Sequence, residues 1–179
     1  MTTNETPPQG TPTGRSTPDR IRRAAIAAAA GGFDGFVHLD WVRDSGASVT
    51  STLALWDQGS LAGVAAGVGW DVVRMDRPRG WRTVQALRTA GVEIGPVLHA
   101  ENHVDVFVPK GSVEDWDQDG ATVVEAGEVL LVPPPSVVAP HTLHARSWIV
   151  APGASLTDGT ALYEAFAAAG ASMALDGTR

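Results

Sequence analysis

The sequence predicts an α+β domain in which helices pack on a mixed, mainly antiparallel sheet. Three observations predict it: short apolar runs with the alternation of strands, a hairpin-like connection between two of them, and longer stretches with helical periodicity. Of the 179 residues, 44% are apolar and 18% are charged, so the chain can bury a sizeable core. We expect a folded domain over residues 21–170, between a disordered tail at 1–20 and a flexible end at 171–179.

Three helices are expected. The first begins at Thr17, where a capping residue, a proline and an acid follow one another, and it ends at Gly31. The second covers residues 81–90, has apolar residues at three-residue steps and follows a turn at 77–80. The third covers residues 156–169, and residues 43–60 fit either a helix or a strand.

Eight short runs have the alternating or continuously apolar pattern of strands. They lie at residues 36–41, 61–67, 70–76, 96–99, 103–108, 121–124, 129–132 and 147–150. The two runs on either side of Ala100-Glu101-Asn102 predict a hairpin. Residues 112–120 are expected to form an acidic loop.

Composition argues against several classes of protein. Cysteine is absent, which excludes a disulfide framework, a thiolate zinc site and a cysteine nucleophile. Without a long apolar run or a signal pattern, we expect a cytoplasmic protein with no membrane partner. The net charge of −7 argues against general nucleic-acid binding, because phosphate contacts need clustered cations.

Two groups of residues carry candidate metal chemistry. Arg74 and Asp76 lie two apart at a strand end and share a face; two carboxylates there would clamp a divalent metal, but an arginine beside an aspartate favours an ion pair. His99, His103 and Asp105 would bind a transition metal if they lined up on one face. Solvated histidines near a turn are the alternative for this second group.

Five arginines lie within 15 positions, at Arg74, Arg77, Arg79, Arg82 and Arg88. Arg77 and Arg79 precede the second helix, where they and the first helical amides can bind a phosphate. The alternative is a charged outer helix face that keeps the protein soluble. No G-x-S-x-G sequence and no P-loop is present.

Residues 21–153 contain four segments in order: AAIAAAAGGFDGFV, LAGVAAGVGWDVVRMDRPRG after Trp56, AENHVDVFVPKG, and ATVVEAGEVLLVPPPS followed by ARSWIV. These segments resemble the N-terminal domain of bifunctional DNA primase/polymerases, the prim-pol group of the archaeo-eukaryotic primase superfamily. The resemblance implies a primase-like palm with metal-binding acids and a histidine that contacts the phosphate of the incoming nucleotide.

The resemblance implies that two site residues are kept and two acids are lost. Asp76 falls on the second metal acid of the family and His103 on its histidine. Arg74 and Thr122 replace the first and third acids, and Glu125 is displaced from the third. Since a cation at a ligand position lowers metal affinity, the resemblance implies a prim-pol fold with a decayed catalytic centre.

Three functions follow from these observations. The first is binding of a nucleotide or single-stranded nucleic acid without efficient catalysis. Its residues would be Asp76, Arg77, Arg79, His103 and Lys110. The second is a non-enzymatic protein-interaction domain, whose partner would contact the acidic loop at 114–119 or the N-terminal tail.

The third is an active DNA primase/polymerase, a nucleotidyltransferase of DNA replication. Asp76 would then hold Mg²⁺ or Mn²⁺ with Asp105 or Glu125, whereas an inactive domain would need no cofactor. A metal-dependent enzyme of another class, built on His99, His103 and Asp105, is a fourth hypothesis.

Overall fold

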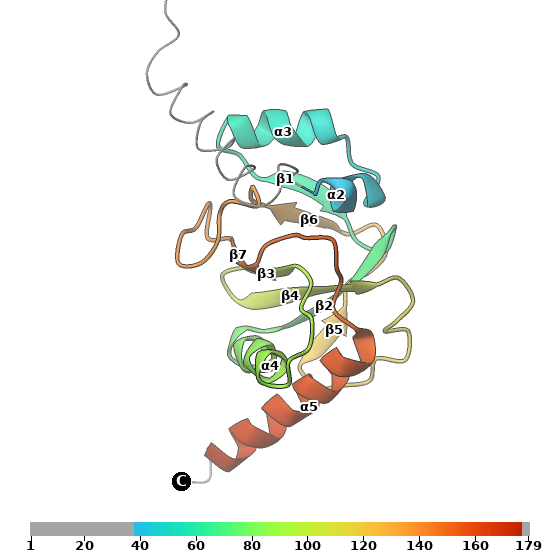
Figure 1. The fold of residues 1–179 in the computed structure, drawn as a ribbon, viewed down its shortest axis with the longest axis vertical. Helices are drawn as coiled ribbons and strands as arrows, with labels where there is room; N and C mark the ends of the chain where they lie inside the picture. The colour runs from blue at the N-terminus through green and yellow to red at the C-terminus, as the bar shows by residue number, and fades with distance from the viewer. Residues whose placement is uncertain (1–37, 177–179) are drawn as a thin grey trace, which may run out of the picture.

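A computed structural model describes residues 38–176 of the chain (Figure 1). In chain order its elements are α2 (Asp40–Asp44), α3 (Val49–Asp57), β1 (Ala62–Ala65), β2 (Trp70–Asp76), α4 (Arg77–Thr89), β3 (Val97–His99), β4 (His103–Pro109), β5 (Ala121–Val123), β6 (Val129–Val132), β7 (Ser147–Val150) and α5 (Gly159–Asp176). Helices pack on antiparallel sheets, which confirms the predicted α+β class. Within the described residues, no helix is long and apolar enough to cross a bilayer.

The strands form two antiparallel sheets. The large sheet has the order β5-β2-β4-β3-β7, and the small sheet pairs β1 with β6. The central pair, β2 and β4, runs in register from Trp70 opposite Pro109 to Asp76 opposite His103. Four candidate site residues, Arg74, Asp76, His103 and Asp105, therefore lie on the two central strands, where the register fixes their relative positions.

The large sheet is covered on both faces (Figure 1). Helices α4 and α5 cover one face, and the small sheet covers the other together with α2 and α3. Along β4 the residues alternate between these two layers: Val104 and Val106 pack with the helices, whereas Phe107 packs toward the small sheet. A polar side chain between the layers therefore needs a partner inside the protein.

Aromatic side chains fill the space between the two sheets. Three buried tryptophans donate their indole N–H groups to main-chain oxygens, Trp56 to Val132, Trp70 to Trp41 and Trp148 to Pro133, at 3.1, 3.0 and 3.2 Å. Phe107 lies among them, with ring centroids 4.5 Å from Trp70 and 5.9 Å from Trp148. Because a buried N–H without an acceptor costs free energy, these bonds stabilise the contacts of α3 with β6, of β2 with α2, and of β7 with the residue after β6.

Helix α4 begins directly where β2 ends, so the turn expected at 77–80 is wrong. Asp76 caps the helix, since its Oδ2 accepts a hydrogen bond of 3.2 Å from the Arg79 N–H. Pro78 fits the first helical turn because that position has no main-chain acceptor to lose. Gly80 then lets the helix cross β4 closely, as a Cβ there would lie 2.7 Å from the Val104 Cβ.

Two further expectations differ from the structure, and one open alternative is decided by it. The strand at 36–41 is wrong over its described part, because Asp40–Asp44 is α2 and buries the neighbours Trp41 and Val42. The undecided stretch 43–60 contains α3, which Ser48 caps. Helix α5 reaches Asp176, so residues 171–176 are helical rather than part of a flexible end. The helix expected from Thr17 and the N-terminal tail lie outside the described residues.

We predict that Gly80→Ala destabilises the protein although alanine favours helices. The added methyl group would lie against the Val104 Cβ of a fully buried strand, and such overpacking costs about 1–3 kcal/mol. Urea unfolding of wild type and variant measures the difference. Gly153→Ala is the matched control, because a Cβ at Gly153 meets no atom within 4 Å. A Gly80→Ala protein that unfolds at higher urea than wild type would contradict the close crossing.

Candidate functional site

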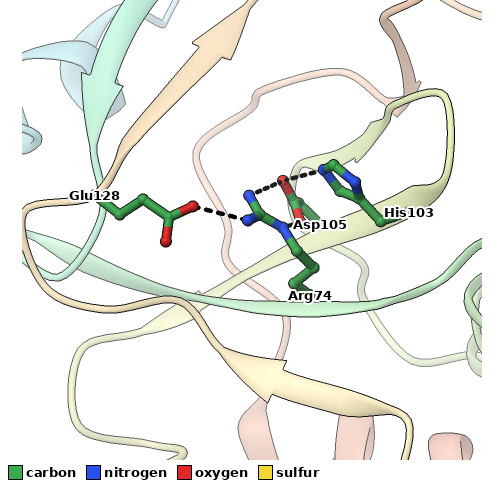
Figure 2. A network of polar contacts seen from close by, with 4 residues as sticks. All are labelled: Arg74, His103, Asp105 and Glu128. Atoms are coloured by element: carbon green, nitrogen blue, oxygen red, sulfur yellow. Dashed lines mark hydrogen bonds and ion pairs between the residues drawn. The ribbon is translucent and has the colours of Figure 1, made fainter.

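Arg74 lies at the centre of a polar network on the face of β2 that is turned to the small sheet (Figure 2). Its Nε and Nη2 donate to the two carboxylate oxygens of Asp105 at 2.8 and 3.1 Å, a two-pronged pairing. Its Nη1 donates to Glu128 Oε1 at 2.7 Å. Asp105 is opposite Arg74 on β4, and Glu128 immediately precedes β6. The guanidinium therefore connects the large sheet to the small one.

The carboxyl group of Asp105 is fully buried and stays ionised. Burial by itself raises the pKa of Asp105, but the contacts with His103 and Arg74 outweigh burial and hold the pKa below its ordinary value. The hydrogen bond to Asp105 raises the pKa of Arg74 against the opposing effect of burial. At neutral pH the pair is thus a buried anion neutralised by its own cation.

His103 extends the network toward the end of the strand pair. Its Nε2 lies 3.4 Å from Asp105 Oδ2 and, among the described residues, has no aligned hydrogen-bond partner. The side chain is 26% exposed, and the residue is opposite Asp76 in the β2–β4 register. His103 is therefore the member of the network at the boundary between interior and solvent.

Pairing places five of the sequence-predicted residues on one face of the large sheet. Directly opposed residues of antiparallel strands point to the same side. Thr122 and Asp105 flank Arg74, and His103 is opposite Asp76. The positions that the prim-pol resemblance singled out on β2, β4 and β5 are therefore neighbours in space.

Arg74 forms ion pairs with acids other than the one expected from the sequence. The sequence favoured Asp76, but residues two apart on a strand point the same way without facing each other, whereas Asp105 lies directly across the sheet. Asp76 instead uses its Oδ2 to cap α4. The strand register, not proximity in sequence, selects the partner.

Three other candidate residues lie apart from this network. Glu125 follows the end of β5 and is exposed. Lys110 follows the opposite end of β4 from His103 and binds Asp71 Oδ1 at 2.9 Å. His99 is opposite Val104, which faces the helices, so it lies on the other side of the sheet from His103. The row of His99, His103 and Asp105 therefore does not form.

Of the two arginines proposed for phosphate binding, Arg79 has its donors occupied within the fold. Its Nη1 donates to Asp119 O at 2.7 Å, its Nε and Nη2 donate to Phe166 O, and its guanidinium lies 3.6 Å over the Phe166 ring. Arg77 is exposed, and its Nη1 donates to Glu101 O at 3.2 Å. Arg77 and His103 are thus the candidate phosphate-binding residues that remain near Asp76.

The residues of this face do not fit a pair of magnesium ions. Two-metal chemistry needs several carboxylates that converge on the ions. Here both oxygens of Asp105 bind Arg74, Asp76 caps a helix and Thr122 has no charge. Within residues 38–176, no three histidine, aspartate or glutamate side chains are grouped so that they could hold a metal ion. The guanidinium supplies the positive charge that a metal would supply.

Glu128 is the member of the network that the sequence analysis did not identify. It follows Gly127, whose φ of +89° shapes the turn between β5 and β6. Glu125, three residues earlier, has the same chemistry and is the acid nearer to the family pattern. Nothing in the local sequence separates the two; the packing of β6 above the large sheet selects Glu128.

The chain matches no protein-family model, no curated protein and no solved structure.

We predict that Arg74→Met destabilises the protein by about 3 kcal/mol, since it leaves the buried Asp105 carboxylate without its cation. Urea unfolding at neutral pH measures the loss. Glu128→Gln is the matched control, because Glu128 is partly exposed and its contact should contribute about 1 kcal/mol or less. Equal effects of the two substitutions would show that burial of Asp105 does not dominate the network.

We also predict that the stabilisation from Asp105 is lost in acid. The folded protein binds this proton less tightly than the unfolded chain does, so protonation favours unfolding. The contribution is complete above the ordinary pKa of 3.8 and disappears as the pH falls through the lower pKa of the folded state. Unfolding free energies between pH 2 and pH 7 should fall less steeply in Asp105→Asn than in wild type. Parallel curves would contradict the lowered pKa.

Proposed function

We propose that this chain is a prim-pol-like domain with a decayed metal centre, which binds a nucleotide or a single-stranded nucleic-acid end without efficient catalysis. The observation that carries the proposal concerns Arg74, which stands where the resemblance expects the first metal-binding acid. Its guanidinium forms ion pairs with Asp105 and Glu128. The fold class and the strand register are compatible with this relationship.

The network argues against nucleotidyl transfer for an electrostatic reason. A divalent ion beside Asp105 would have to displace a guanidinium that binds both carboxylate oxygens, and would then face that displaced cation. Asp76 is the one family-equivalent acid left, and a single carboxylate holds Mg²⁺ weakly. Binding of Mg²⁺ or Mn²⁺ would therefore need a rearrangement that brings Asp76 together with Asp105 or Glu125.

Binding of a phosphate group is supported by the residues at the edge of the network. His103 keeps part of its ring exposed, and Arg77 carries an exposed guanidinium. The Arg77 N–H donates to Asn102 O at 3.2 Å, which holds the start of α4 against the residue before His103. An imidazole and a guanidinium on adjacent segments can donate to the same phosphate.

We predict saturable binding of a fluorescent dNTP at low salt, with no gain in affinity from Mn²⁺. His103→Ala and Arg77→Gln should each weaken binding at least about fivefold, because each removes a donor to the phosphate. Lys110→Gln is the matched control, since Lys110 lies at the far end of β4 and binds Asp71. The same protein should not extend a primed template.

Two outcomes would contradict the proposal. Primer extension by wild type that Asp76→Ala abolishes would identify an active primase/polymerase. Absence of saturable dNTP binding at low salt would end the nucleotide-binding role and favour the protein-interaction alternative.

That alternative has one specific observation in its favour. Val129 and Leu131 lie on the outer side of β6 and are 60% and 44% exposed. Two exposed apolar side chains on a chain with a net charge of −7 are more typical of a protein contact than of a nucleic-acid contact.

A further inference from the structure

A hollow of about 510 Å³ lies on the side of the large sheet opposite the Arg74 network. Its wall includes Trp81 and Arg88 of α4, His99 of β3, Ile149 of β7, and Pro140 and Thr142 from the segment that leads into β7. This volume is within the range of small-molecule sites in proteins, which is about 300–1,000 Å³. The hollow takes no part in the function proposed above.

The charge of the hollow favours an anion. No aspartate or glutamate lines it, although the chain contains 20 acidic residues. Arg88 is exposed and donates through Nη2 to Ile149 O at 3.4 Å, and within residues 38–176 no carboxylate forms an ion pair with it. Burial and then the neighbouring Arg77 and His103 lower the pKa of His99, so at neutral pH the charge of the hollow comes from Arg88.

The shape of the wall favours a planar ring. Trp81 is 39% exposed although it belongs to a helix packed on the sheet, and its indole lies 5.9 Å from the His99 ring. An exposed indole offers a flat apolar surface on which an aromatic ring can stack. Pro140 adds a second rigid apolar surface to the same hollow.

We propose that this hollow binds a small planar aromatic carboxylate, with its ring on Trp81 and its carboxylate on Arg88. One guanidinium can hold a carboxylate through two parallel hydrogen bonds. A phosphate dianion is less well matched, because Arg88 is the single cation of the wall at neutral pH. A nucleotide shares the combination of ring and anion, so the test separates the two.

The experiment titrates the full chain with 2-naphthoate by calorimetry. We expect saturable binding that weakens at least about tenfold in Arg88→Gln and in Trp81→Ala, and for the uncharged 2-naphthalenemethanol. Arg82→Gln is the matched control, because Arg82 is the neighbouring cation on α4 but binds Asp176 and lies outside this wall. It should bind 2-naphthoate as wild type does.

The proposal would be overturned by an absence of saturation at millimolar 2-naphthoate, by unchanged affinity in Arg88→Gln, or by tighter binding of adenosine monophosphate than of 2-naphthoate. His103→Ala separates this proposal from the nucleotide-binding one. It should leave 2-naphthoate binding unchanged, because His103 lies on the other face of the sheet. A loss of 2-naphthoate binding in His103→Ala would also overturn it.

Discussion

The two-pronged pairing between Arg74 and Asp105 is the constraint on which the interior between the two sheets depends. A carboxylate that is 0% exposed needs a counter-charge inside the protein, and Arg74 supplies it from the adjacent strand. Glu128 continues the pairing to the small sheet. Trp56, Trp70 and Trp148 pack in the same interior with their indole N–H groups bonded to main-chain oxygens, so the polar centre and the aromatic core support the same arrangement of sheets.

This pairing also determines which chemistry the face supports. In a two-metal site the carboxylates repel one another and the ions hold them together. Here the Arg74 guanidinium holds the carboxylates of Asp105 and Glu128 together. Asp76 instead stabilises the start of α4. What remains at the edge is an imidazole and an exposed guanidinium, the two groups on which the proposed phosphate binding rests. The hollow lined by Trp81 and Arg88 lies on the other side of the sheet, so the two proposed ligand sites share no residue.

Much of the fold was predictable because local patterns decided it. The strand at 70–76 was predicted with its observed bounds, because Trp70, Val72, Val73 and Met75 make it rich in apolar residues up to Asp76. The hairpin of β3 and β4 was also predicted, because its turn residues interrupt two apolar runs. Residues 40–57 were not, since Trp41 and Val42 are adjacent and both buried, a pattern that alternation does not describe. The turn expected at residues 77–80 was also wrong, because Asp76 caps α4 and these residues form its first turn.

The sequence by itself determined the fold class, the central strands and the shared face of Arg74 and Asp76, because these depend on periods of two and on short-range caps. Only the tertiary structure decided that Arg74 pairs with Asp105 and Glu128, which lie 31 and 54 residues away along the chain. It also turned His99 to the opposite side of the sheet from His103. Such choices depend on strand register and on how two sheets stack, and both are set by contacts between residues far apart in sequence.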